Sequence, residues 1–150
     1  MVYVSVIGTG EASVEQYERA REVGRLVAER GGIVVCGGRG GVMEAAARGA
    51  TEAGGVAIGI LPDEDRGQAN PYLTYSLVSG IGQARNLAVA CSGEVVIAVG
   101  GGYGTLSEIG LARRFGKAMI SLDSWDLAGH VTAVDSAEQA VEEAFALAGS

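Results

Sequence analysis

The chain has 150 residues, which is enough for one domain with a buried core and too few for two domains of ordinary size. Its net charge of -7 excludes the broad basic surface that nucleic acids and anionic membranes require. Glycine supplies 25 residues without a collagen-like period, so the glycines are expected at turns. We therefore expect one domain over residues 1–150, with no nucleic-acid or membrane partner.

Neither a membrane anchor nor a disulfide framework is expected. No apolar run approaches the ~20 residues of a membrane span, and Met1 leads directly into an apolar run without a basic leader. Cys36 and Cys91 lie in separate apolar runs, which favours two small core residues in a reducing compartment over a reactive or metal-binding pair. These features predict a cytoplasmic protein without a metal site.

In chain order, short β-rich runs alternate with segments of helical periodicity, which predicts a mostly parallel sheet with helices on both faces. The first helix is expected from Ser13, which has capping-box spacing to Gln16, to about Arg30. The last helix is expected to follow Ser136 as its N-cap. The expected strands are 2–7, 33–36, 56–61, 72–79, 94–99, 117–122 and a short edge strand at 131–134. The sequence therefore predicts a single Rossmann-like α/β domain.

Two segments between these elements have features of their own. Residues 62–71 contain two prolines, three acids and no apolar period, which predicts a loop that could act as a mobile lid. The helix that follows the fourth expected strand has a stripe of small apolar residues, which could serve the internal core or a subunit contact. This stripe consists of Ala84, Leu87, Ala88 and Cys91.

The strongest functional signal is a glycine pattern that follows two of the strands. Residues 37–44 and 101–108 both read Gly-Gly-x-Gly-x-x-x-Glu. Glycines after a strand let the backbone approach a ligand, and the free N–H groups of the following helix favour an anion. Both loops are expected at one edge of the sheet, where they would line one phosphate site. The expected ligand-binding residues are Gly8, Thr9, Gly37, Gly38, Arg39, Gly40, Gly101, Gly102, Tyr103, Gly104 and Thr105.

The two common nucleotide fingerprints do not fit this sequence. No Gly-Lys-Ser/Thr follows the glycines, and the second strand ends in Cys36 and Gly37, where a dinucleotide-binding fold needs an acid for the ribose. A mononucleotide or another single-phosphate ligand therefore fits better than NAD. His130 is expected in a surface loop, because no Ser or Cys stands in a nucleophile context.

Two charged residues each have two interpretations. Glu108 could form a capping box with Thr105 in its own helix, or it could be a carboxylate at the rim of the phosphate site that acts as an acid or base or binds a hydroxyl. Arg85 could be a solvated side chain or a fork that binds the ligand phosphate. The sequence leaves both pairs of interpretations open.

Four segments, taken in order, resemble the Lonely Guy (LOG) family, once labelled possible lysine decarboxylases. They are residues 37–43 (GGRGGVM), residues 59–62 (GILP), Arg85-Asn86 and residues 100–108 (GGGYGTLSE). The resemblance spans nearly the whole chain and implies a homodimer or dimer of dimers that hydrolyses the N-glycosidic bond of nucleoside 5'-monophosphates. It also implies that Glu108 is the catalytic carboxylate and that Arg85 is the catalytic or phosphate-orienting arginine. The phosphate cradle that it implies consists of Gly101, Gly102, Gly104 and Thr105.

Two departures from the LOG pattern change the expected function. The proline before the glycine pair is Gly100 here, and the lysine after the arginine is Asn86. The chain therefore looks more like a sister branch of small LOG-like proteins, related to molybdenum-cofactor carriers and to the DprA/Smf Rossmann domain. In carriers the same pocket is thought to hold a pterin monophosphate.

These features together predict a LOG-like binding or carrier protein. It should need no cofactor and should bind an AMP-like nucleotide, phosphate or molybdopterin. The alternative is a phosphoribohydrolase that releases base and ribose 5-phosphate from nucleoside 5'-monophosphates. Lysine decarboxylation is not expected, because Lys117, at the start of a strand, is the only lysine and no convincing pyridoxal-phosphate site surrounds it.

Overall fold

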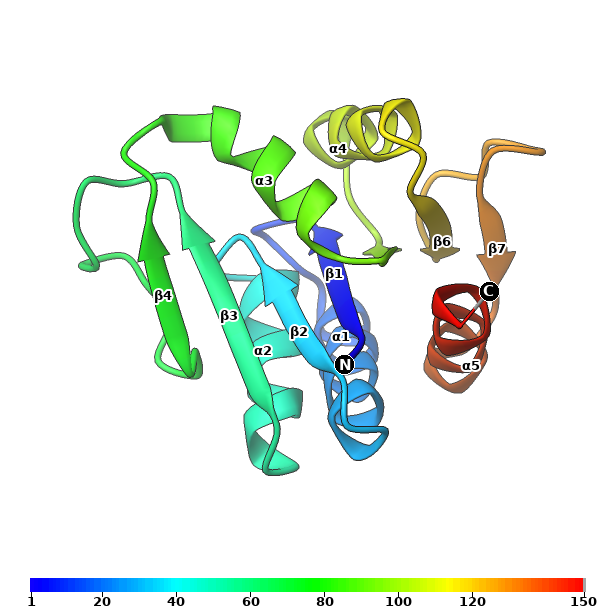
Figure 1. Cartoon of the computed structure of the whole chain (residues 1–150), viewed down its shortest axis with the longest axis horizontal. Coiled ribbons are helices and arrows are strands. Elements are labelled where there is room, and N and C mark those ends of the chain that lie inside the picture. Colours follow the sequence, from blue (N-terminus) through cyan, green and yellow to red (C-terminus); the bar gives the residue numbers. More distant parts are fainter. Residues whose placement is uncertain (150) are drawn as a thin grey trace.

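A seven-stranded parallel sheet organises residues 1–149, which are the residues that the computed structural model describes (Figure 1). Every neighbouring pair of strands is parallel, and the strand order is β4-β3-β2-β1-β5-β6-β7. The strands are β1 (Tyr3–Gly8), β2 (Ile33–Cys36), β3 (Val56–Leu61), β4 (Tyr75–Val78), β5 (Val95–Val99), β6 (Ala118–Leu122) and β7 (Thr132–Val134).

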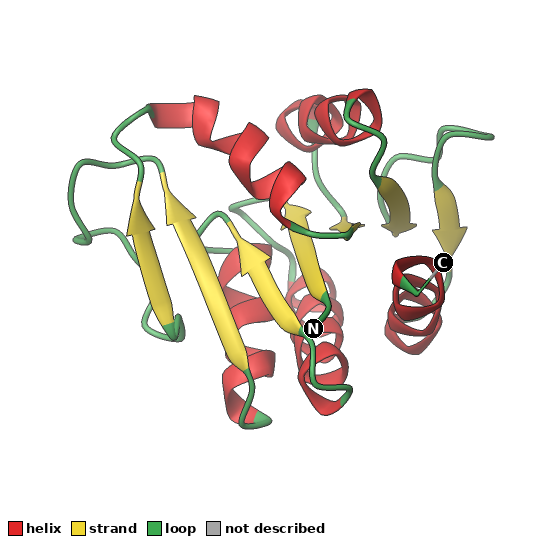
Figure 2. Ribbon diagram, viewed as in Figure 1, coloured by secondary structure: helices red, strands yellow, loops and turns green. Residues whose placement is uncertain are grey.

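Helices cover both faces of this sheet (Figure 2). One face carries α1 (Val14–Glu29), α2 (Val42–Glu52) and α5 (Ala137–Ala148), and the other carries α3 (Arg85–Ser92) and α4 (Tyr103–Arg114). A single 3-10 turn, η1 (Gly82–Ala84), leads into α3. An apolar cluster lies between the sheet and each helical layer. The Rossmann-like α/β fold expected from the sequence is therefore confirmed.

Local sequence signals placed most of these elements correctly. The Ser13 hydroxyl accepts a hydrogen bond from the Gln16 N–H at 3.1 Å, and the Gln16 side chain accepts one from the Ser13 N–H at 3.0 Å. This capping box starts α1 as predicted. Ser136 caps α5 in the same way, through the Gln139 N–H at 3.1 Å. All five residues of β5 are buried, as its unbroken apolar run predicted for a central parallel strand.

The structure corrects the expected length of β4 and the core placement of Cys91, and it excludes the internal-core interpretation of the α3 stripe. β4 is shorter than the predicted 72–79, because the side chain of Asn70 accepts the Tyr72 N–H at 3.0 Å and holds the chain in a turn before the strand begins. The small apolar stripe on α3 faces solvent, since Leu87 is exposed and Cys91 is only half-buried. The residues of α3 that are buried are Arg85, Val89 and Ala90. Cys91 is therefore not a core residue, whereas Cys36 is fully buried.

The topology reverses between β1 and β5. The chain adds β2, β3 and β4 on one side of β1, and it then returns to add β5, β6 and β7 on the other side. Ligands of parallel sheets bind beyond the carboxyl ends of the strands at such a reversal. Both glycine loops lie at this edge, directly after β2 and β5, as expected. Within residues 1–149, no helix has the length and apolarity needed to span a membrane.

Candidate functional site

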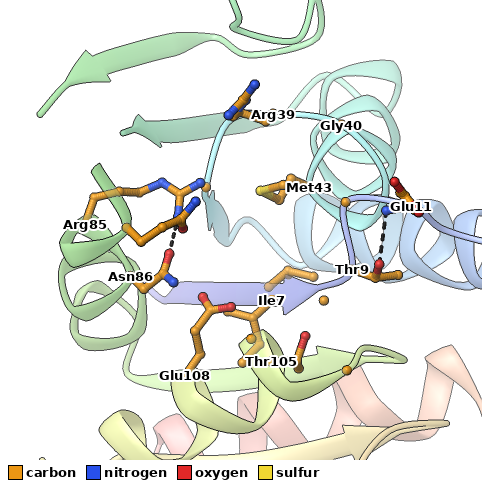
Figure 3. A pocket seen from close by; sticks show the side chains of 17 residues that line it. Ile7, Thr9, Glu11, Arg39, Gly40, Met43, Arg85, Asn86, Thr105 and Glu108 are labelled. Atoms are coloured by element: carbon orange, nitrogen blue, oxygen red, sulfur yellow. Dashed lines mark hydrogen bonds between the residues drawn. The ribbon is translucent and has the colours of Figure 1, made fainter. Parts of the chain in front are cut away.

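A cavity of about 590 Å³ lies at the edge of the sheet where the topology reverses (Figure 3). Its volume is within the range of small-molecule sites. The cavity is formed by the end of β1, the loop after β2, the start of α3 and the first turns of α4. The expected ligand-binding residues that line it are Gly8, Thr9, Gly37, Arg39, Gly40, Gly102, Gly104 and Thr105, together with Arg85 and Glu108.

Three of the expected residues lie outside this lining. A Cβ on Gly38 would come within 2.8 Å of the Leu61 side chain, so Gly38 packs against the core next to the loop. Gly101 has a φ of +107° and packs against Thr105, where it shapes the turn. Tyr103 is 83% exposed, with its ring 6.0 Å from that of Trp125. Gly38 and Gly101 therefore shape the turns beside the cavity, and Tyr103 lies outside the cavity.

The two glycine segments form different turns despite their matching pattern. The N-cap of α2 is Gly41, whereas the N-cap of α4 is Gly102, which aligns three residues earlier in the pattern. Glu44 therefore falls in the first turn of α2, where it accepts the Tyr17 hydroxyl at 2.7 Å. Glu108 falls one turn further along α4 and lines the cavity. The second copy of the repeat thus supplies a cavity carboxylate, Glu108, whereas the glutamate of the first copy, Glu44, serves helix packing.

Some glycines of the cavity are required by close packing and others are not. A Cβ on Gly37 would lie 2.6 Å from the Met43 sulfur and 3.1 Å from Nη2 of Arg85, so the absence of a side chain lets the guanidinium lie across the loop. Gly10, Gly102 and Gly104 have no atom within 4 Å of an added Cβ, and none has a positive φ. Side chains at these three positions would instead take up space at the cavity.

Arg85 is buried, with an exposed fraction of 5%, so the solvated interpretation is wrong. Its Nη1 donates to Oδ1 of Asn86 and lies 3.5 Å from Oε1 of Gln83, while the buried Nε has no partner among the described residues. Burial lowers the pKa of Arg85, and the nearby Glu108 carboxylate opposes that shift. The guanidinium thus keeps unused donors beside the cavity.

Glu108 points into the cavity from α4 (Figure 3). Burial raises the pKa of its carboxyl group from 4.5 to about 7, and the Arg85 cation acts in the opposite direction. The capping-box interpretation is wrong, because α4 begins at Tyr103, Gly102 is its N-cap and no side chain caps it. Thr105 lies inside the helix and is buried. The described residues therefore place a desolvated carboxyl group next to a buried cation.

The raised pKa predicts that Glu108→Gln stabilises the protein at high pH. The carboxylate ionises near pH 4.5 in the unfolded chain and near 7 in the folded chain, so its destabilising effect appears between these pH values and is complete above about 7. We expect the variant to gain about 2 kcal/mol at pH 8, or ~4–8 °C in Tm, after allowing for partial exposure of the group. At pH 4 the gain should nearly vanish, because both states are then largely protonated. Thermal melts at both pH values test this, and an equal gain at both would contradict it.

Both glycine loops are held from outside by residues that sequence reasoning missed. Nε1 of Trp125 donates to the Gly102 carbonyl at 2.9 Å, and the Ser124 hydroxyl donates to the Gly100 carbonyl at 2.6 Å. The Asn70 amide donates to the Arg39 carbonyl at 2.9 Å. Each support comes from the loop that follows a neighbouring strand, which no local pattern could indicate.

The loop at 62–71 forms a loop as predicted, but none of its residues lines the cavity. Its buried Asn70 instead fixes the first glycine loop, since the Asn70 N–H also donates to the Gly38 carbonyl at 2.9 Å. Other cavity residues were also missed, although each stands within a few residues of one that was expected. These are Val6, Ile7, Gly10, Glu11, Met43, Gln83 and Asn86.

Comparison with known proteins places the chain among small Rossmann-like proteins. The model of the SLOG cluster4 family matches residues 1–147. A relative from Archaeoglobus fulgidus, described only as an uncharacterized protein, is 43% identical over 122 residues, which are 81% of this chain and 80% of the relative.

Solved structures agree with this placement. The molybdenum cofactor binding protein from the phototrophic bacterium Rippkaea orientalis has a TM-score of 0.92 and 35% identity, covering 97% of this chain and 96% of that one. The molybdenum cofactor carrier protein from Chlamydomonas reinhardtii has a TM-score of 0.91 and 32% identity, covering all of both chains. DNA processing protein A from Helicobacter pylori, at 19% identity and a TM-score of 0.74 over 97% of this chain and 80% of that one, shares the fold alone.

Proposed function

The chain belongs to the SLOG cluster4 family, and from this premise we propose that it binds a small phosphate-bearing ligand in the cavity and acts as a carrier. One observation carries the proposal. Gly10, Gly102 and Gly104 line the cavity although neither close packing nor a positive φ requires glycine there. Close approach of a ligand to the backbone explains their lack of side chains. Two arginines, Arg39 and Arg85, line the same cavity and favour an anion.

The phosphate group belongs, in this proposal, at the start of α4. The first N–H groups of that helix have no partner within the helix, and its dipole favours negative charge there. Thr105 adds a hydroxyl, and Arg39 lies across the cavity (Figure 3). The relatives from Rippkaea and Chlamydomonas are described by the molybdenum cofactor that they bind or carry. Molybdopterin is therefore the first candidate, with an AMP-like nucleotide or phosphate as further ligands. A cytoplasmic location is part of the same proposal.

The alternative function is hydrolysis of nucleoside 5'-monophosphates, and Glu108 favours it. A carboxyl group with a pKa of about 7 can exchange protons at neutral pH, and its anionic form would stabilise positive charge on a ribose ring. Asn86 supports the carrier instead. It stands where LOG enzymes have lysine, and its amide oxygen accepts a hydrogen bond from Arg85.

Incubation with AMP separates the two functions. For a carrier we expect AMP to raise Tm without release of free adenine, in wild type and in Glu108→Gln alike. Release of adenine by wild type that the variant abolishes would establish the hydrolase. Glutamine keeps the size of the side chain and removes only its charge, so this comparison tests the carboxylate itself.

The phosphate site is tested by two further substitutions. Thr105→Val and Arg39→Ala should each weaken AMP binding by about 10-fold, because each removes one donor to the phosphate. Thr132→Val is the matched control, since Thr132 is exposed on the edge strand β7 and lies outside the cavity lining. If neither AMP nor a phosphopterin binds at millimolar concentration, the proposed function is wrong.

We also propose that the chain forms a homodimer or dimer of dimers through the side of the molecule that carries α3 and β4. Between residues 67 and 93 the only charged residue is Arg85, which is buried. The exposed apolar side chains of this segment are Tyr75, Leu77, Ile81 and Leu87. A surface without charge lets two copies of a chain with net charge -7 approach each other. Light scattering that returns a clean monomer at micromolar concentration would contradict this.

A further inference from the structure

We infer that Glu108 selects the ring of the ligand. Its carboxylate pairs with one edge of guanine and pterin rings, where a ring N–H and an exocyclic amino group lie next to a carbonyl oxygen. This inference rests on the proposed function, because it needs a phosphate-bearing ligand in the cavity. It gives Glu108 a task in a protein that carries its ligand without cleaving it.

The orientation of the ligand follows from the two ends of the cavity. Arg85, Asn86 and Glu108 lie together at one end, and Thr9 lies at the opposite end (Figure 3). A phosphate placed against Glu108 would meet a carboxylate, which is unfavourable in a partly desolvated site. The phosphate therefore takes the end with Thr9 and the start of α4, where the Glu11 carboxylate is exposed and screened by water and the first N–H groups of the helix favour an anion. The ring of the ligand then extends toward Glu108.

Glu108 needs a neutral partner with two donors. Its carboxyl group accepts no hydrogen bond within residues 1–149, and burial disfavours its charged form. A carboxylate has two acceptor oxygens, and two parallel N–H groups satisfy both of them without bringing a charge into the cavity. Guanine and pterin offer such a pair. Adenine offers an amino donor beside a ring acceptor, and the lone pair of that acceptor would face the ionised carboxylate, so the discrimination is greatest above pH 7, where Glu108 is charged.

Arg85 completes the recognition of this edge. The carbonyl oxygen of guanine and pterin lies next to the ring N–H, so it needs a donor beside the Glu108 carboxylate. The Arg85 guanidinium lines the cavity near Glu108, and its terminal nitrogens carry more N–H donors than the bond to Asn86 uses. That bond to Asn86 fixes the orientation of the guanidinium. Glu108 and Arg85 therefore supply an acceptor and a donor at the same end of the cavity, which are the groups that this ring edge requires.

Titration calorimetry with GMP and IMP tests the inference, because IMP lacks only the exocyclic amino group. Wild type should bind GMP at least about 10-fold more tightly than IMP, since loss of one donor leaves a buried acceptor unpaired. Glu108→Gln should reduce this ratio to about 3-fold or less. Glu11→Gln is the matched control, because Glu11 lines the cavity at the end with Thr9 and its loss removes the same charge. This control should keep the ratio of wild type. Chromatography after each titration checks that the nucleotide is intact.

Ribose 5-phosphate separates this inference from the proposed function. If ribose 5-phosphate, GMP and IMP bind equally well, the phosphate site stands and ring selection by Glu108 is wrong. If Glu108→Gln keeps the preference for GMP, another residue selects the ring and the inference is also wrong. If none of the three compounds binds at millimolar concentration, the inference and the proposed function both fail.

Discussion

Alanine in place of Gly49 is expected to destabilise the fold by about 3 kcal/mol, although alanine is the better helix former by about 1 kcal/mol. Gly49 lies within α2, and a Cβ there would come within 1.9 Å of the Arg21 carbonyl oxygen in α1. The obstacle is backbone, which cannot rotate away as a side chain can. Gly24 in α1 makes the reverse contact, with an added Cβ 2.0 Å from the Ala46 carbonyl oxygen. The two helices therefore touch at two glycines, and α2 would have to move as a whole.

Gly110→Ala is the control for this prediction. Gly110 is an exposed residue within α4, and no atom lies within 4 Å of a Cβ added there. The same substitution should stabilise the protein at this position by about 0.5–1 kcal/mol through helix propensity alone. Urea unfolding of both variants, compared with wild type, measures the difference. A Gly49→Ala variant as stable as wild type would show that α1 and α2 can separate without loss.

A displacement of α2 would also move the first glycine loop of the candidate site. The Val42 N–H at the start of α2 donates to the Thr9 carbonyl at 3.0 Å, which joins the first glycine loop to the end of β1. A Cβ on Gly41, the N-cap residue, would come within 2.3 Å of that same oxygen. We therefore expect Gly49→Ala to weaken ligand binding as well, through the position of this loop.

The fold was predictable because its signals are local. The apolar run of β5 and the glycines after it indicate a buried strand and a turn without reference to any distant residue. The carboxyl ends of parallel strands then share one edge of the sheet, so the meeting of the two glycine loops follows from the alternation of strands and helices. Helix starts with side-chain caps, such as Ser13 and Ser136, could be predicted for the same reason.

The details of the site were less predictable because they depend on distant contacts. Thr105 has the residue type of an N-cap, but α4 starts earlier, where Trp125 holds the Gly102 carbonyl from another loop. Arg85 resembles a solvated residue in a helix with an apolar stripe. It is buried because Gly37, in the loop after β2, leaves room for its guanidinium. Glu108 has no capping role because the Trp125 contact with the Gly102 carbonyl lies where α4 starts, which leaves Thr105 inside the helix.

Replacing Arg85 by methionine is expected to reduce GMP affinity by about 100-fold, because the ring carbonyl loses its charged donor and truncating one partner of a buried charged hydrogen bond costs about 2–5 kcal/mol. Arg85 is the buried cation of the cavity, and its positive charge also offsets the Glu108 carboxylate. Without it, an anionic ligand would enter a cavity whose remaining buried charge has the same sign as its own. Calorimetry at pH 7.5 measures the loss.

Two further arginine variants test whether the loss of affinity is specific to Arg85. Arg39→Met should cost about 10-fold, since Arg39 is only half-buried and water screens its charge. Arg114→Met should leave the affinity unchanged, because Arg114 is exposed at the far end of α4 and lies outside the cavity lining. Thermal melts of the free proteins check that Arg85→Met is folded. If the folded variant binds GMP within about 3-fold of wild type, Arg85 does not contact the ligand, and the ring carbonyl must have another donor.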